Sequence, residues 1–188
     1  MEQGYSCGNF YTEQSFNLFG NCNSLIFGDN ASLYRDLTGY NDCYTGLFSG
    51  CIGLRNVSPN FLPATTLAEY CYSNMFDGCE SLVNTPELPS TTLVDGCYQY
   101  MFSNCTSLVS APELPATTLT TDCYYKMFFG CALLNYIKAL FTTKPSYTFT
   151  GEWVKGVSST GIFVKSRSAS WNVTGASGIP TGWTVQTV

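Results

Sequence analysis

The chain has 188 residues and a formal net charge of −5, with 45% hydrophobic and only 11% charged residues. This length fits one structural unit with a cap better than two independent domains. The sequence contains no histidine, which excludes Cys–His and Ser–His nucleophilic pairs and removes the commonest metal ligand.

The N-terminal residues lack both the basic and the apolar segment of a signal peptide. No window along the chain reaches the roughly 18 apolar residues of a membrane-spanning helix. We therefore expect no signal peptide in the chain as given and no membrane insertion.

A block that begins with Cys-Tyr returns along the chain at a fixed spacing. Written C-Y-x-x-M-F-x-G/N-C-x-x-L, it occupies residues 71–82, 97–108 and 123–134, in steps of 26 residues. A weaker copy occupies residues 43–54, and a degenerate one lies around residues 18–25. A fixed period in the twenties predicts a solenoid of about five coils of 26–29 residues over 1–141, each burying its apolar face against its neighbours.

Within each coil the apolar pattern predicts one short helix and one short strand. Cys97, Met101 and Cys105 follow an i, i+4, i+8 pattern, which is typical of an apolar helix stripe. Gly or Asn always precedes the second cysteine and predicts a helix C-cap there. The segment after it predicts an extended strand of three to five residues, ended by proline and stacked in parallel, with the helices outside. The expected core columns are Met75, Met101, Met127, Leu82, Leu108 and Leu134.

The C-terminal block, residues 142–188, breaks the repeat and holds all three tryptophans. Its aromatic and β-branched runs, broken by glycine and serine, predict three or four antiparallel strands. Two interpretations follow. The block is either a small β cap over the open end of the solenoid or an attachment element that docks the solenoid to a larger assembly.

The charges divide unevenly along the chain. The first 125 residues carry twelve acidic and two basic side chains, whereas residues 126–188 carry six basic side chains and Glu152. An acidic solenoid argues against a nucleic-acid partner, which needs clustered lysine and arginine. The asymmetry either favours head-to-tail association or has no functional meaning, and the sequence leaves the oligomeric state open.

Eight of the ten cysteines form two columns within the repeat. The two cysteines of one block are eight residues apart, about 12 Å along a helix, which exceeds the roughly 7 Å limit for a disulfide. Buried free thiols are therefore favoured over bridges between coils. A zinc site is disfavoured because the spacing is not that of zinc ligands, and we expect neither a metal nor a cofactor.

The repeat phrase M-F-x-G-C-x-x-L followed by a strand and Leu-Pro resembles the leucine-rich repeats of the bacteroidal surface-antigen type, the BspA-like class. The resemblance covers roughly residues 14–137. It implies a cell-surface or secreted protein, typical of Bacteroides and its relatives, that acts in binding or adhesion. The C-terminal block is similar to tails that follow such repeats in gut bacterial and phage proteins.

These observations predict a non-catalytic recognition or adhesion module that binds a protein or glycan through the solenoid face. The alternative is a structural component of a virion or surface layer, docked through the C-terminal block. The expected location is the cell surface, the extracellular medium or a virion. Exposed positions that vary between matching coils are the candidate contacts: Asn60, Asn84, Glu87, Ser110 and Glu113.

Overall fold

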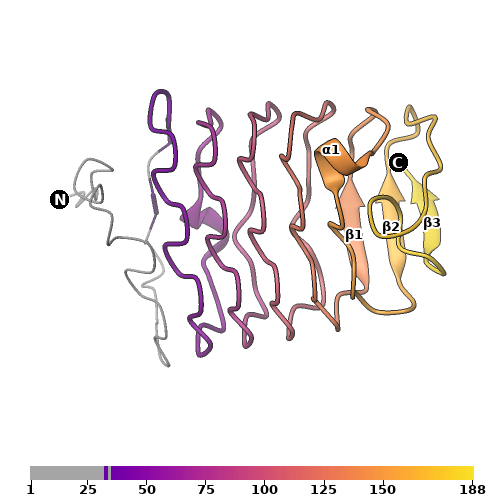
Figure 1. Ribbon diagram of the computed structural model, residues 1–188, viewed down its shortest axis with the longest axis horizontal. Helices are drawn as coiled ribbons and strands as arrows, with labels where there is room; N and C mark the ends of the chain where they lie inside the picture. Colours follow the sequence, from indigo (N-terminus) through magenta and orange to yellow (C-terminus); the bar gives the residue numbers. More distant parts are fainter. Residues whose placement is uncertain (1–31, 34) are drawn as a thin grey trace.

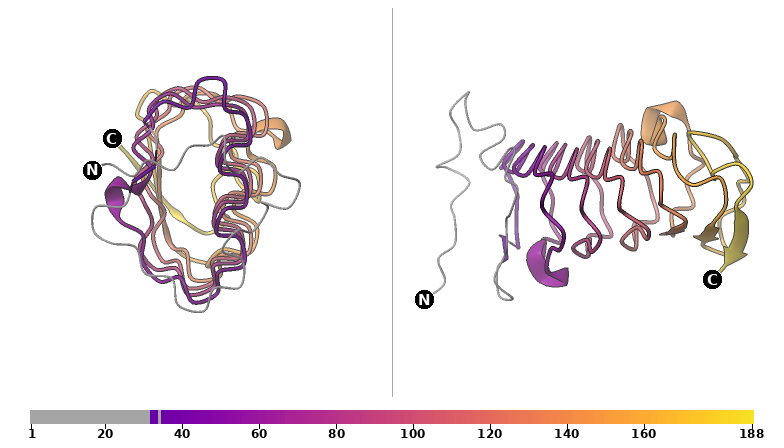
Figure 2. Two further views of the ribbon diagram at one scale, coloured as in Figure 1. Left: turned by 90° about the vertical axis from the view of Figure 1, so that its left-hand side faces the viewer. Right: turned by 90° about the horizontal axis from the view of Figure 1, so that it is seen from below.

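The computed structural model describes residues 32–33 and 35–188 of the chain. These residues form a stack of coils that runs from the N-terminal to the C-terminal end of the molecule (Figure 1). Viewed along the stack, the coils enclose a common interior between a folded wall and a more extended wall (Figure 2). We call these the turn wall and the strand wall. The degenerate coil expected around residues 18–25 lies outside the described residues.

The turn wall consists of consecutive β-turns, so the outer helices predicted for the described coils are wrong. Residues 41–50 are all in turns, and every fourth residue of this wall has a positive φ, as at Asp42, Gly46 and Gly50. The N–H of the residue after each of them donates to the carbonyl three residues earlier, as from Leu47 to Tyr44. A left-handed residue at the third turn position is typical of type II turns and cannot continue an α-helix.

Every second N–H group of the turn wall joins one coil to the next. Those of Tyr44, Gly46, Phe48 and Gly50 donate to carbonyls of the following coil at 2.7–2.9 Å. The same alternation recurs between the later coils. Backbone groups that a helix would have satisfied internally are thus used to hold neighbouring coils together.

The strand wall is interrupted by proline in the earlier described coils. There the pairing is reduced to isolated parallel bridges such as Asn56 with Asn84, because Pro86 and Pro112 lack the donor that a ladder requires. A regular sheet begins with β1 (Tyr136–Ala139), where the segment has no proline. The 3₁₀ helix η2 (Pro59–Phe61) bulges from this wall. Its coil is two residues longer than the 26-residue period, and the bulge accommodates the extra residues.

The C-terminal block continues the stack, and its strands are parallel, so the predicted antiparallel element is wrong. β1 pairs in parallel with β2 (Ile162–Lys165), which pairs in parallel with β3 (Thr184–Thr187). The short helix α1 (Tyr147–Thr150) lies in the connection between β1 and β2. Parallel pairing follows because each strand is separated from the next by a whole coil rather than by a hairpin.

The sixth repeat keeps the 26-residue offset on the turn wall as well. The N–H of Phe128 donates to the carbonyl of Trp153, as that of Phe102 donates to Met127. Trp153 therefore occupies the column of Met75, Met101 and Met127. The sequence repeat ends near residue 141, but the stack of coils runs on across that point.

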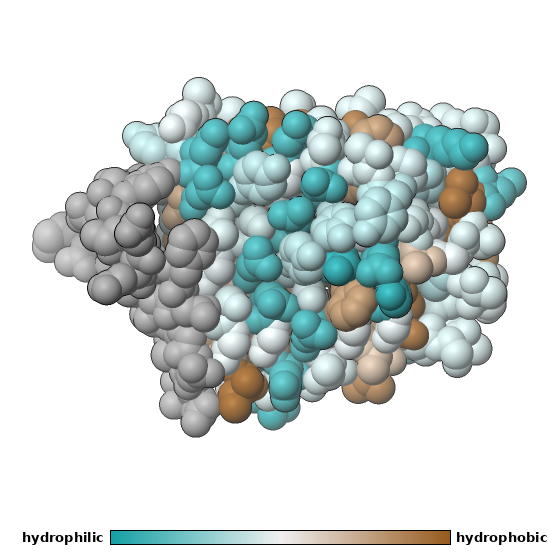
Figure 3. All heavy atoms as spheres, viewed as in Figure 1, coloured by the Kyte–Doolittle hydropathy of each residue, from teal (hydrophilic) through white to brown (hydrophobic). Residues whose placement is uncertain are grey.

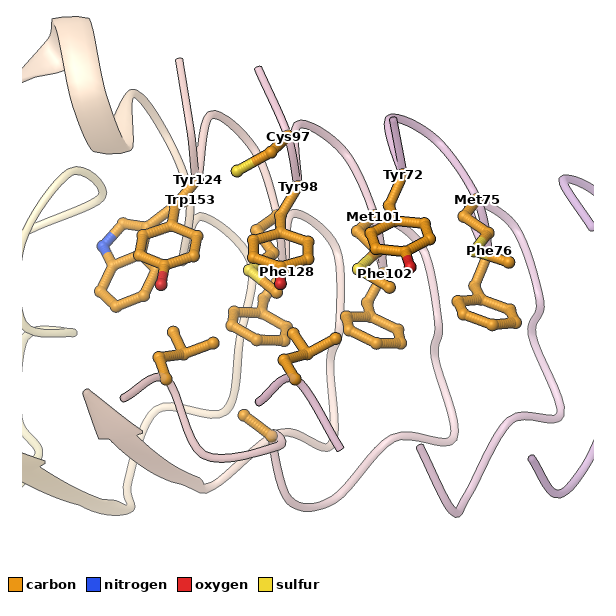
Figure 4. Close-up of a cluster of buried hydrophobic side chains, with 14 of the residues drawn as sticks. Tyr72, Met75, Phe76, Cys97, Tyr98, Met101, Phe102, Tyr124, Phe128 and Trp153 are labelled. Atoms are coloured by element: carbon orange, nitrogen blue, oxygen red, sulfur yellow. The ribbon is translucent and has the colours of Figure 1, made fainter. Parts of the chain in front are cut away.

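The core lies between the two walls as rows of identical side chains (Figure 4). Tyr98 stacks on the tyrosines of both neighbouring coils with ring centroids 6.0 and 6.1 Å apart, and Phe102 lies in a parallel row. The predicted methionine and leucine columns are confirmed, since all six side chains are fully buried. Each contributes roughly 1.5–3 kcal/mol when buried, so the stability of one coil depends on its neighbours.

Two glycines that share a left-handed backbone allow a matched test of the turn wall. A Cβ at Gly96 (φ +62) would overlap the ring of Tyr70, whereas one at Gly39 (φ +78) would meet nothing within 4 Å. We expect Gly39→Ala to lose about 1 kcal/mol to backbone strain. Gly96→Ala is expected to lose about 1–3 kcal/mol more, because the tyrosine must move. Urea denaturation of both variants measures the difference, and equal losses would contradict the close packing of Tyr70 on Gly96.

Candidate functional site

The strand wall carries a shallow groove of about 540 Å³ that crosses three consecutive coils. Each coil contributes the residues that follow its core leucine, so the repeat brings equivalent positions side by side. The lining residues are Asn56, Val57, Ser58, Pro59, Val83, Asn84, Thr85, Ser110 and Ala111.

The centre of the groove is ordered by an asparagine pair on adjacent coils. The side-chain amide of Asn84 donates to the side-chain oxygen of Asn56 at 2.6 Å, and the two residues form a parallel bridge. The N–H of Val57 donates to the carbonyl of Asn84 at 3.0 Å. Side chain and backbone therefore both fix the spacing of the two coils at the groove.

The chemistry of the groove is that of amides, hydroxyls and small apolar groups. Val83 leaves 41% of its surface exposed beside Asn84. Among the described residues, those that line the groove include no charged and no aromatic side chain. Such a surface offers hydrogen bonds and modest apolar contact but no group that could act as a general acid or base.

Two of the five predicted contact residues, Asn84 and Ser110, lie in this groove. Asn60 is exposed on η2, and Glu87 and Glu113 are exposed outside the lining. The carboxylate of Glu113 forms an ion pair with Lys138 at 2.8 Å. Sequence reasoning missed Asn56, although its place in one column with Asn84 and Ser110, 28 and 26 residues apart, was the available signal.

The eight cysteines of the described residues are buried thiols, which agrees with the predicted columns. The Sγ atoms of Cys79, Cys105 and Cys131 donate to carbonyls of the preceding coil at 3.0–3.2 Å. Burial raises the pKa of Cys79 and Cys131 to about 12. A thiol held protonated in this way is neither a nucleophile nor a metal ligand at neutral pH.

Within residues 32–33 and 35–188, no three His, Cys, Asp or Glu side chains are grouped as metal ligands. The same residues contain no helix of the length and apolarity that crossing a membrane requires. Comparison with known proteins identifies no relative: no family model, curated protein or solved structure matches the chain.

Proposed function

We propose that the protein is a non-catalytic recognition module that binds an extended segment of a protein partner in the strand-wall groove. The observation that carries this proposal is the groove itself, because it crosses three coils and runs over equivalent polar positions. A ligand that lies across several coils gains contacts at each of them, as the elongated surfaces of solenoid proteins allow. The resemblance to BspA-like repeats supports a location on a cell surface, in the medium or on a virion.

The composition of the groove favours a polypeptide as the ligand. The amides of Asn56 and Asn84 and the hydroxyl of Ser110 match the donors and acceptors of an extended backbone. Exposed Val83 and Pro59 provide apolar contact for side chains of the partner. A non-catalytic role is supported by the absence of histidine from the sequence and by the protonated state of the buried thiols.

A second candidate function is that of a structural component of a virion or surface layer. It is favoured by β3, whose four residues are all exposed and which pairs with β2 along one edge. The edge of a parallel sheet can accept a further strand. Under this proposal the C-terminal end docks the stack to an assembly, while the groove has no ligand.

The proposed function predicts saturable binding that a bulky side chain in the groove weakens. Fluorescently labelled protein is titrated onto intact gut-type bacterial cells and onto immobilised host matrix proteins. We expect Ser110→Tyr to weaken binding at least about tenfold, because the ring fills the groove. The substitution suits the fold, since Tyr136 occupies the paired position of the next coil.

The matched control is the double variant Glu87→Gln and Glu113→Gln, which alters exposed carboxylates outside the groove lining. Its affinity is expected to equal that of the parent protein. Parent-like binding by Ser110→Tyr would overturn the groove as the site. Absence of saturable binding to both surfaces would overturn the recognition module and leave the structural role as the remaining candidate.

A further inference from the structure

The turn wall carries a mixed aromatic and charged cluster, on the side of the molecule away from the groove. It spans three coils in the second half of the stack. Figure 3 shows this face, on which hydrophilic residues surround exposed rings. We call it the turn-wall patch, and its members are Tyr100, Tyr125, Lys126, Phe129, Tyr147, Glu152 and Lys155.

The backbone of the patch is held in a conformation that its residues rarely adopt. Tyr100, Lys126 and Glu152 have φ values of 55°, 51° and 52°. The same column holds Gly46 and Asn74 in the earlier coils, which enter this conformation cheaply. A bulky residue there costs roughly 1–2 kcal/mol. Hydrogen bonds to the following coil hold these three residues in this conformation and so fix the backbone from which the patch side chains project.

The charges of the patch are organised around the rings. The ammonium of Lys126 lies 5.4–5.5 Å from the ring centroids of Tyr100, Tyr125 and Phe129. Glu152 pairs with Lys126 at 3.6 Å and with Lys155 at 2.6 Å. The hydrogen bond from Lys155 is the main reason that the pKa of the Glu152 carboxyl is lowered. Two ammonium groups therefore share one carboxylate, which leaves the patch with a net positive charge.

Tyr147 provides the open aromatic surface of the patch. Its side chain is 62% exposed, its ring meets that of Tyr125 edge-on at 5.7 Å, and the two hydroxyls lie 3.2 Å apart. An exposed, oriented ring of this kind offers an apolar face with polar groups at its rim. Lys155 is also exposed and lies on the same surface, with its ammonium 5.8 Å from the ring centroid of Phe129.

We propose that the turn-wall patch binds a pyranose glycan that bears carboxylates. The apolar C–H face of a pyranose stacks on an aromatic ring, while its hydroxyls bond to phenol, ammonium and carboxylate groups of the rim. The net positive charge of the patch selects an acidic sugar. Of the six lysines and arginines of residues 126–188, Lys126 and Lys155 belong to the patch. The inference concerns a second surface and is independent of the groove.

Binding of the full chain to alginate, a linear polymer of uronic acids, tests the proposal by calorimetry or biolayer interferometry. Neutral dextran and poly-glutamate are the comparison ligands, the first without charge and the second without pyranose rings. We expect saturable binding to alginate and at least about tenfold weaker binding to both comparison polymers. Equal binding of poly-glutamate would overturn sugar recognition in favour of simple charge attraction. No binding of alginate would overturn the proposal outright.

Variants of Tyr147 test whether alginate binds at the turn-wall patch. Tyr147→Ala removes an exposed ring, so the fold is expected to be kept while affinity for alginate falls at least about tenfold. Tyr147→Phe keeps the ring and is expected to retain affinity within about threefold. Ser110→Tyr, in the groove, is expected to leave alginate binding unchanged. Parent-like binding by Tyr147→Ala would overturn the assignment to this patch.

Discussion

The protein is expected to unfold in alkaline solution, about one to two pH units above the ordinary thiol pKa, while remaining stable at neutral pH. Burial raises the pKa of Cys123 to about 11 and that of Cys79 and Cys131 to about 12. Burial also raises the pKa of Cys97 and Cys105 well above the usual range. In the unfolded chain the same thiols ionise near pH 8.5.

The direction in which stability changes with pH follows from proton linkage. Above pH about 8.5 the unfolded chain loses thiol protons that the folded chain retains, so stability falls as the pH rises toward the folded pKa values. Each thiol contributes a loss of up to about 1.4 kcal/mol per pH unit, and the five together lose up to about 7 kcal/mol per pH unit. Because domains are stable by only about 5–15 kcal/mol, one to two pH units above this point suffice for unfolding.

Urea titrations at pH about 7, 9 and 10.5 under reducing conditions measure this loss. Cys105→Ala provides the control, since it removes one buried thiol and is expected to reduce the slope by about 1.4 kcal/mol per pH unit, whatever its own cost in packing. The buried tyrosines Tyr98 and Tyr124, whose pKa values are also raised by burial, add to the loss at still higher pH. Equal stability at all three pH values would contradict a core of protonated thiols.

The repeat spacing predicted the core columns because equivalent residues of stacked coils must face the same interior. It could not distinguish a helix from tandem turns. Over nine residues, Cys97, Met101 and Cys105 share one side of a helix of 3.6 residues per turn, and they also share one side of turns that repeat every four residues. The Gly or Asn before the second cysteine does indicate a left-handed residue in the described coils. That residue belongs to the last of several consecutive turns, however, and not to the cap of a helix.

The left-handed positions of the middle column show why the turns were hard to predict. Gly46 and Asn74 suggest a left-handed backbone, whereas Tyr100, Lys126 and Glu152 occupy the same column and are unfavourable there. The inter-coil hydrogen bonds on both sides hold them in place. Tertiary pairing thus overrides local preference at the positions that form the turn-wall patch, so the patch was absent from the sequence-based prediction.

The C-terminal coil was missed because its residues change while its geometry does not. Trp153 replaces methionine, and Thr150 stands where Tyr124 lies one coil earlier. Gly156 still follows Gly130 by 26 residues, with φ values of 85° and 73°. The sequence named two groove residues, Asn84 and Ser110, as candidate contacts because they vary at an exposed column, but it did not predict the groove itself. That Glu87 and Glu113 lie outside the lining depends on local backbone shape that no spacing encodes.

Trp153→Ala is expected to destabilise the protein by about 3–5 kcal/mol, the range for removing a buried aromatic side chain. The indole is fully buried and lies among the rings of Tyr124, Phe128, Phe141 and Phe163 at centroid distances of 5.9–6.2 Å. Its Nε1 donates to the carbonyl of Gly178 at 2.8 Å, which ties the last coil to the one before it. Thermal unfolding and limited proteolysis measure the loss and locate it.

Two controls separate the packing role of Trp153 from a general sensitivity of the protein to substitution. Trp153→Met restores the residue of the three preceding coils and is expected to cost less than the alanine variant, because it fills part of the cavity. Leu133→Ala alters a side chain that is 56% exposed and is expected to change stability by no more than about 0.5 kcal/mol.

The region that becomes sensitive to protease in Trp153→Ala shows whether residues 142–188 are an integral part of the stack. If they are, Trp153→Ala opens the C-terminal coils and exposes Tyr124 and Phe128, so protease sensitivity spreads into the coil of residues 123–134. If the block were an independent anchor, the variant would lose residues 142–188 to protease while the earlier coils kept their melting temperature. The continuous hydrogen bonding of Phe128 and Gly130 to residues 153 and 155 leads us to expect the first result.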